Sequence, residues 1–281
     1  MDVLLAPFRY EFFRNGALSS MLIGVLCGLL GVYIVLRGMS YIGHGLSHAV
    51  FGGAAVSFAL QWNFYAGAGL WGFLAALLIT QTVRRYRISA DAAIGIVTTA
   101  SFALGVAIVS SKHRFMQDLE ASLFGSILGV TVEQLAGVAI VTTLVGMGIF
   151  VLYRPLLFTT FDEETAHAYG VRTQRIDTFF SLALASAIIV SMQVIGVTLI
   201  AAAIVIPPIT ARIVTDRFDR MLLISMVVGA FTALLGIYLS YYLDTSSGAT
   251  IVLTQAAVFV LALLVSAIRG RNRLAAIDYH V

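Results

Sequence analysis

The chain contains a series of apolar runs, each about 20 residues long, and these runs constrain its fold more than any other feature. They cover residues 17–36, 42–61, 64–83, 92–110, 133–153, 221–242 and 250–268. A helix of about 20 residues spans the hydrocarbon core of a bilayer, whereas a barrel strand needs only about half that number. With 60% hydrophobic and 11% charged residues, the chain lacks the side chains to cover a water-exposed surface. The sequence therefore predicts an all-α polytopic membrane protein.

The apolar stretch 177–213 decides how many spans are predicted. Its 37 residues are too many for one ordinary span and enough for two short ones. In that case Ser191-Met192-Gln193 would form the hairpin, and Pro207-Pro208 would break the second helix.

The distribution of basic residues favours two spans there, because cytoplasmic loops carry an excess of Arg and Lys. With nine spans, 4 of the 17 basic residues lie on one side and 13 on the other, namely those at 37, 84–87, 154–175, 212–220 and 269–273. With eight spans the split is 7 to 10. We therefore predict about nine transmembrane helices, with the N-terminus outside and the C-terminus in the cytoplasm.

The connections between the runs contain no soluble domain, so residues 1–281 are predicted to form a single transmembrane domain. The longest polar connection is the cytoplasmic segment 154–176. The net charge of +3 comes from the loops. It therefore bears on orientation in the lipid bilayer, and nucleic acid is not an expected partner.

Two histidines four residues apart, His44 and His48, lie in the apolar run 42–61. In a helix this spacing places both imidazoles on one face, one turn apart, where they can bind one metal ion. Imidazole is a good ligand for zinc, iron, nickel or copper and a weaker one for manganese. Two ligands make an incomplete site, which suits a carrier that must release its ion. The alternative is that both rings satisfy buried backbone carbonyls between helices.

The sequence argues against two kinds of enzyme. The His-x-x-x-His spacing resembles a zinc-protease helix, but Gly45 stands where the glutamate base would be needed. A phosphate-binding loop requires Gly-Lys-Ser/Thr, and the one lysine of the chain, Lys112, is followed by His113. If transport uses ATP, another polypeptide must hydrolyse it. We predict no permanently bound cofactor.

The cytoplasmic segment 161–172 is predicted to contain a short helix that Asp162 caps and Gly170 ends. Short helices of this kind in permeases dock on motor subunits; the alternative is a solvated interfacial helix. On the opposite side, the turn 244–248 and residues 112–120 are candidates to receive a substrate-delivery protein, although such a turn is more often only a connection. Asp91 is predicted to cap the fourth span.

Five motifs occur in the order in which they occur in the permease subunits of ABC importers for zinc, manganese and iron, which the chain resembles from about residue 15 to about residue 268. They are Met39-Ser40-Tyr41-Ile42-Gly43 with Leu46-Ser47-His48-Ala49; Asp91-Ala92-Ala93-Ile94-Gly95-Ile96; Phe161-Asp162 with Ala166 and Gly170; Gly196-Val197-Thr198-Leu199 through Pro207 to Ala211-Arg212; and Ser247-Gly248-Ala249-Thr250-Ile251-Val252-Leu253. Each motif is weak alone, and the five in order are specific.

The resemblance implies a multi-pass permease in the inner or plasma membrane of a prokaryote. It implies a homodimer with the pathway between the two copies, two cytoplasmic ATP-binding subunits, and an external metal-binding protein. By similarity, Phe161, Asp162, Ala166 and Gly170 belong to the helix that couples to the ATPase. His48 matches the family histidine that contacts the metal. The family usually has aspartate where this chain has His44, and a pair of imidazoles favours zinc over manganese or iron.

We therefore expect a permease that imports a divalent metal by alternating access, with zinc favoured and manganese or iron as alternatives. One rival is a secondary transporter or channel driven by an ion gradient, although the carboxylates expected of a proton relay are missing from the spans. A second rival is an ABC exporter or a membrane scaffold that transports nothing.

Overall fold

The computed structural model describes residues 6–86, 88–111, 123–126 and 130–278, and every regular element in these ranges is a helix. The first elements in chain order are η1 (Ala6–Arg9), α2 (Glu11–Leu36), α3 (Ile42–Ala59), α4 (Phe64–Tyr86) and α5 (Ala90–Ser111). They are followed by α7 (Val132–Val151), α8 (Tyr153–Phe161), α9 (Glu163–Ala168), α10 (Thr173–Ile195), α11 (Ile200–Val214), α12 (Phe218–Leu243) and α13 (Ser247–Asp278). The prediction of an all-helical chain is confirmed.

Seven of the described helices are long and apolar enough to cross a membrane. They are α2, α4, α5 as far as Ile108, α7, α10, α12 and α13 as far as Ile268. Two further helices fall short of this group: α11 is apolar but has 15 residues, and α3 has 18 residues that include both histidines. The count of nine spans includes these two helices. That count and the orientation of the termini therefore stay predictions.

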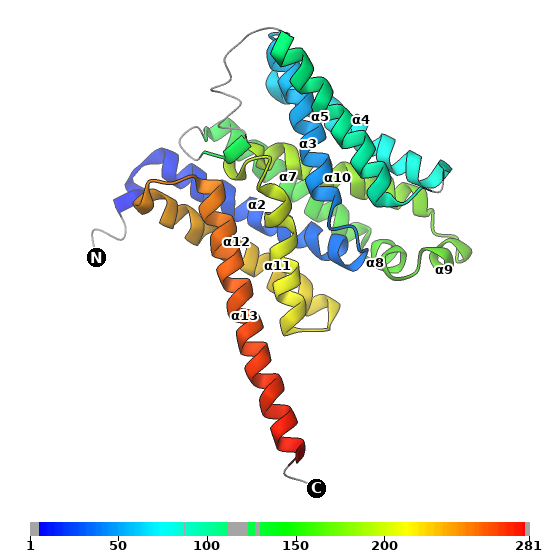
Figure 1. Ribbon diagram of the computed structural model, residues 1–281, viewed down its shortest axis with the longest axis vertical. Helices are drawn as coiled ribbons and strands as arrows, with labels where there is room; N and C mark the ends of the chain where they lie inside the picture. Colours follow the sequence, from blue (N-terminus) through cyan, green and yellow to red (C-terminus); the bar gives the residue numbers. More distant parts are fainter. Residues whose placement is uncertain (1–5, 87, 112–122, 127–129, 279–281) are drawn as a thin grey trace.

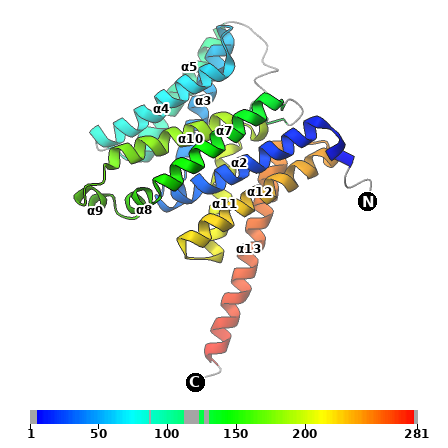
Figure 2. The ribbon, with the colours of Figure 1, turned by 180° about the vertical axis from the view of Figure 1, so that it is seen from behind.

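The helices form two groups that α10 joins. In one group α2 packs against α7, α11 and α12, and in the other α3 packs against α4 and α5. Helix α10 contacts α2, α3, α4 and α7. The short helix α9 and the N-terminal η1 lie at opposite ends of the bundle, and α13 extends away from it towards the C-terminus (Figures 1 and 2).

Glycines allow the two main helices of the first group to touch backbone to backbone. A Cβ atom added at Gly24 of α2 would lie 2.3 Å from the carbonyl oxygen of Gly229 in α12, and one added at Gly229 would lie 2.2 Å from that of Gly24. Such close approach is how small residues stabilise helix pairs in lipid, where apolar side chains gain little from leaving the solvent.

The stretch 177–213 does form two helices, but two details of the prediction are wrong. Helix α10 continues through Ser191-Met192-Gln193 to Ile195 and is capped by Gly196, whose φ of +89° is a conformation that glycine reaches without strain. Helix α11 also continues through Pro207 and Pro208 to Val214. Prolines are tolerated in membrane helices where neighbours compensate for the lost hydrogen bonds. Here Gly31 of α2 approaches the carbonyl of Ile204, which Pro208 leaves without its helical donor.

The capping role predicted for Asp91 is also wrong. Helix α5 begins at Ala90, and the hydroxyl of Ser89 accepts a hydrogen bond of 3.3 Å from the Ala92 N–H. Asp91 lies in the first turn, where a carboxylate still interacts favourably with the helix dipole. The sequence pattern did not separate the two roles because both residues are common at helix starts.

Candidate metal pathway and coupling site

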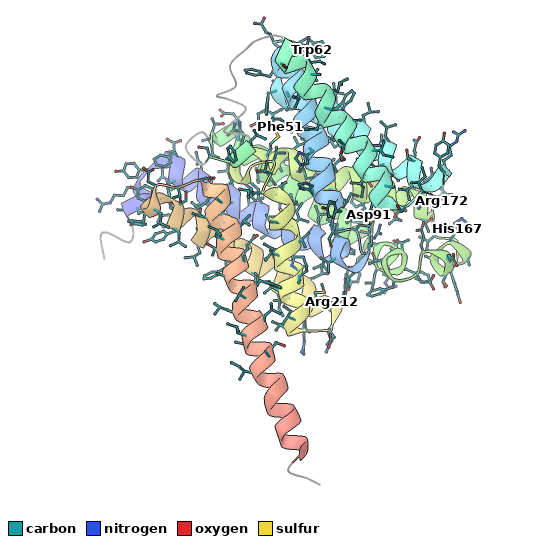
Figure 3. The ribbon with its side chains drawn as sticks, in the orientation of Figure 1. Phe51, Trp62, Asp91, His167, Arg172 and Arg212 are labelled. Carbon is teal, nitrogen blue, oxygen red and sulfur yellow. The ribbon has the colours of Figure 1, made fainter. Side chains whose placement is uncertain are left out.

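The histidine pair lies near the start of α3, at the end that faces away from Trp62. Figure 3 shows α3 running from the region of Asp91 to that of Trp62. Because α3 begins at Ile42 and a helix rises about 1.5 Å per residue, His44 and His48 lie roughly 3 and 9 Å along it. Arg37 precedes this start by five residues. If Arg37 is on the cytoplasmic side, as in the nine-span prediction, the pair lies in the inner half of the membrane.

The structure brings the two imidazoles together. Their Nε2 atoms are 3.3 Å apart, and the ring planes are 87° apart. Two nitrogens bound to one tetrahedral zinc at 2.0–2.1 Å each would be about 3.3 Å apart. The same separation fits a long N–H···N hydrogen bond between neutral rings, whose donor depends on the tautomer. The geometry is therefore suited to a shared ion without requiring one.

The two rings differ in their surroundings. His44 is exposed, whereas His48 is half-buried with its ring 5.1 Å from that of Phe102 in α5. The buried Nδ1 of His48 has no hydrogen-bond partner among the described residues. A ring that binds metal through Nε2 normally donates its other N–H to an acceptor, and none of the described residues supplies that acceptor.

The pair supplies at most two ligands. Within the described part of the chain, no group of three or more His, Cys, Asp or Glu side chains is placed to hold a metal ion. The described side chains alone therefore do not complete a coordination sphere, and the remaining ligands would be water, backbone oxygens, residues outside the described ranges or a second copy of the chain.

The segment around Asp162 forms the short helix that the sequence predicts. Asp162 is the N-cap of α9: its Oδ1 accepts a 2.8 Å hydrogen bond from the Thr165 N–H, and its Oδ2 accepts a 2.5 Å bond from the Thr165 hydroxyl. The hydroxyl, and after it the backbone N–H, holds the pKa of Asp162 below its ordinary value of 3.8, because both stabilise the charged form. The cap is therefore ionised at neutral pH.

The other residues predicted to couple to the ATPase lie within α9 or next to its ends. Phe161 ends α8 and is exposed, and Ala166 is the one fully buried residue of α9. Gly170, with φ of +84°, ends the helix: its N–H donates to the His167 carbonyl and the Val171 N–H donates to that of Ala166. Figure 3 shows His167 and Arg172 at the edge of the molecule. Most residues of the segment 161–172 are exposed, while Ala166 is buried and Thr165 and Val171 are partly buried.

An ion cluster behind α9 was missed by the sequence analysis, which counted its arginines only as loop charges. Arg84 at the end of α4 bonds Glu163 of α9 at 2.7 Å and also forms an ion pair with Asp177 of α10. Asp177 in turn pairs with Arg37, the C-cap of α2, at 2.9 Å. These residues are far apart in sequence, so no local pattern joins them. One hint lies in the sequence: Arg84 directly follows the apolar run 64–83, and Asp177 begins the apolar stretch 177–213.

At the opposite end of α10, two motifs meet the segment 123–126 in what we call the glycine junction: Gly125, Gly196 and Gly248 with their neighbours. A Cβ added at Gly248 would lie 1.8 Å from the carbonyl oxygen of Ile195. Hydroxyl groups complete the junction: Thr198 donates to the Leu123 carbonyl, Ser246 to that of Phe124 and Ser247 to that of Val194. In the turn 244–248, the residues Ser246, Ser247 and Gly248 are therefore packed against these neighbouring segments. Residues 112–120, the other candidate for receiving a delivery protein, lie outside the described residues. Their role stays a prediction.

Seven long apolar helices, a pair of polar side chains in the shorter helix α3 and an exposed short helix at one end are typical of the membrane subunit of a transporter. The sequence matches the ABC 3 transport family over residues 9–266. The chain therefore belongs to this family, and it is a multi-pass membrane transport subunit.

Individual relatives agree with this assignment. The chain is 35% identical to the manganese transport system membrane protein MntC of Halalkalibacterium halodurans over 93% of this chain and 89% of that protein. It is 35% identical to the chelated iron transport system membrane protein YfeC of Yersinia pestis, over 92% and 88% of the two chains. The structure of PsaBC from Streptococcus pneumoniae in complex with Fab matches with a TM-score of 0.83 and 31% identity, over 92% and 94%.

Proposed function

We propose that the chain is the permease subunit of an ATP-driven importer of a divalent transition-metal ion. The observation that carries this proposal is the pair of imidazole nitrogens 3.3 Å apart on α3, in a chain of a metal-transporting family. An exposed imidazole inside a membrane helix is costly against hydrocarbon. The face of α3 that bears His44 is therefore expected to line a polar passage or to meet a second copy of the chain.

We propose that the metal is cargo, with zinc favoured by the two imidazoles. The relatives named for manganese and for chelated iron support those ions as the alternatives. His44 is the residue that discriminates, because an imidazole and a carboxylate differ in the metals they prefer.

The partners follow from what the chain lacks. It contains no phosphate-binding loop, so a separate ATP-binding subunit would dock on α9 and the exposed Phe161. Two ligands do not complete a site, which supports a homodimer with the pathway between the two copies. An extracytoplasmic metal-binding protein would deliver the ion, and ATP binding would switch the dimer between outward-facing and inward-facing states.

Metal uptake by the complex in proteoliposomes tests the proposal. The permease, its ATP-binding subunit, the metal-binding protein and ATP should together import radioactive zinc. His44→Ala and His48→Ala should each lower uptake at least tenfold, since a two-ligand contact would lose half of its donors. His44→Asp should retain transport and shift preference from zinc towards manganese. Assembly of the complex and its basal ATP hydrolysis serve as the control, because the histidines lie away from α9.

Two results would contradict the proposal. Unchanged uptake in both alanine variants would remove the pair from the pathway. Uptake by the permease alone, driven by an ion gradient without ATP, would favour the secondary transporter.

A further inference from the structure

We propose that Arg84 is a positioning residue that links the coupling helix α9 to the start of α3 through the chain of ion pairs Glu163–Arg84–Asp177–Arg37. The inference rests on the proposed function and adds to it a route from the ATPase-docking helix to the helix that bears the histidines.

The cluster joins four elements at the α9 end of the bundle. Glu163 belongs to the first turn of α9, Arg84 to the last turn of α4 and Asp177 to the second turn of α10, while Arg37 caps α2. Two guanidinium groups meet two carboxylates, so the cluster is neutral. Because Glu163 of α9 bonds Arg84 of α4, a rigid shift of α9 acts directly on the Arg84 guanidinium.

Arg37 is the fixed end of this chain of pairs. Besides Asp177, its side chain donates to the Thr160 hydroxyl at 3.1 Å and the Thr159 hydroxyl at 3.0 Å, both in α8. Its guanidinium carbon also lies 4.9 Å from the centre of the Phe180 ring. The side chain is 10% exposed. Arg37 is thus held by α8 and α10 immediately before the turn that leads into α3.

Arg84, in contrast to Arg37, can exchange partners. A single terminal nitrogen of its guanidinium, which carries two hydrogens, faces three acceptors: Glu163 Oε1 at 2.7 Å, Thr173 Oγ1 at 3.4 Å, and Asp177 Oδ2. Two hydrogens cannot serve three acceptors fully. The arginine can therefore release Glu163 while it keeps Asp177, at little electrostatic cost.

Space for this exchange is present. A cavity of about 330 Å³ is lined by the cluster and by Met39 and Ile42 from the entry to α3. Close-packed interiors resist side-chain movement, whereas a cavity beside Arg84 allows its side chain to swing. The same cavity places the cluster against the first residues of the histidine-bearing helix.

A double-mutant cycle on the assembled complex tests the link. Glu163→Gln and Arg84→Gln should each lower ATP-dependent uptake of radioactive zinc or manganese roughly tenfold, and the double variant should lower it no further, because either change breaks the same link. ATP hydrolysis should stay near the wild-type rate, so that more ATP is consumed per ion. A merely structural role would lower hydrolysis and uptake together.

Glu164→Gln is the matched control, since Glu164 is the neighbouring exposed carboxylate of α9 and has no ion pair among the described residues; its uptake should equal that of the wild type. Multiplicative losses in the double variant would overturn the link. So would loss of the ATP-binding subunit on purification of Glu163→Gln, which would make Glu163 a docking residue. A wild-type complex that imports no metal with ATP would instead refute the proposed function.

Discussion

The two ends of α10 are stabilised by different chemistry. At its start, Asp177 belongs to a cluster of charged side chains that includes Arg37 and Arg84. Beyond its last residue, Gly196 belongs to the glycine junction, where backbone meets backbone and side-chain hydroxyls bond carbonyl oxygens. The 23 residues of α10 span about 35 Å between the two.

These contacts indicate which end of α10 can move. A guanidinium nitrogen that faces more acceptors than it carries hydrogens can change partners, whereas a carbonyl in contact with a glycine Cα gives way only if the segments separate. We therefore expect substitutions at the glycine junction to affect mainly stability. Substitutions in the ion cluster should affect mainly transport.

The largest effect is expected for Gly248→Ala. The added methyl would lie 1.8 Å from the Ile195 carbonyl oxygen and 2.7 Å from that of Phe124, and both are backbone atoms. Overpacking of this kind should lower the free energy of unfolding by about 3 kcal/mol. Thermal unfolding of the purified protein in detergent measures it.

Gly146→Ala in α7 is the control, because nothing lies within 4 Å of the position of its added methyl. It should be neutral or stabilising by up to about 1 kcal/mol. If the two variants unfold at the same temperature, the glycine junction is not the rigid end of the molecule.

A smaller, local effect is expected for Gly170→Ala. The new side chain would meet nothing within 4 Å, but the φ of +84° at this position strains any residue with a Cβ. The strain should cost about 1 kcal/mol and should be confined to the end of α9. Hydrogen exchange of residues 162–170 should become faster while the midpoint of global unfolding stays unchanged.

Gly95→Ala, a substitution in α5 with equal space and an ordinary φ, should leave exchange in α9 unchanged. A large drop in global stability for Gly170→Ala would mean that α9 is part of the core rather than a helix attached at the surface.

The helices in this comparison could largely be predicted from the sequence. The contacts between residues far apart in the chain could not. Apolar runs predicted the long helices, and Asp162 and Gly170 predicted the bounds of α9, because these signals are local. The hairpin was placed at Ser191-Met192-Gln193 instead of Gly196 because polar side chains are tolerated inside a buried helix. Arg84 and Asp177 are 93 residues apart, so only the folded chain shows that they meet.

A still smaller effect on stability is expected for Glu163→Gln. Its ion pair with Arg84 is partly exposed, and Arg84 keeps Asp177 as a partner. Pairs of this kind contribute roughly 0.2–1 kcal/mol, so the unfolding temperature should change little while ATP-dependent uptake falls. Unfolding curves in low and high salt measure this, with Glu164→Gln as the control. If Glu163→Gln lowered the free energy of unfolding as much as Gly248→Ala, the distinction between a rigid glycine junction and an ion cluster that can change partners would be wrong.

The smallest effect concerns the cap of α9 and its dependence on pH. The Thr165 hydroxyl and backbone N–H hold the pKa of Asp162 below 3.8. The cap therefore stabilises α9 fully above the ordinary pKa, and this contribution is lost as the pH falls through the lowered one. Hydrogen exchange of residues 163–168 relative to Asp162→Asn, which cannot titrate, should show wild-type protection persisting below pH 3.8. In Thr165→Val, which removes the hydroxyl and keeps the N–H, the loss should begin at higher pH. If the wild-type protection is half lost at a pH above 3.8, Thr165 does not stabilise the charged form of Asp162. The cap of α9 would then be as easily lost as the ion pairs behind it.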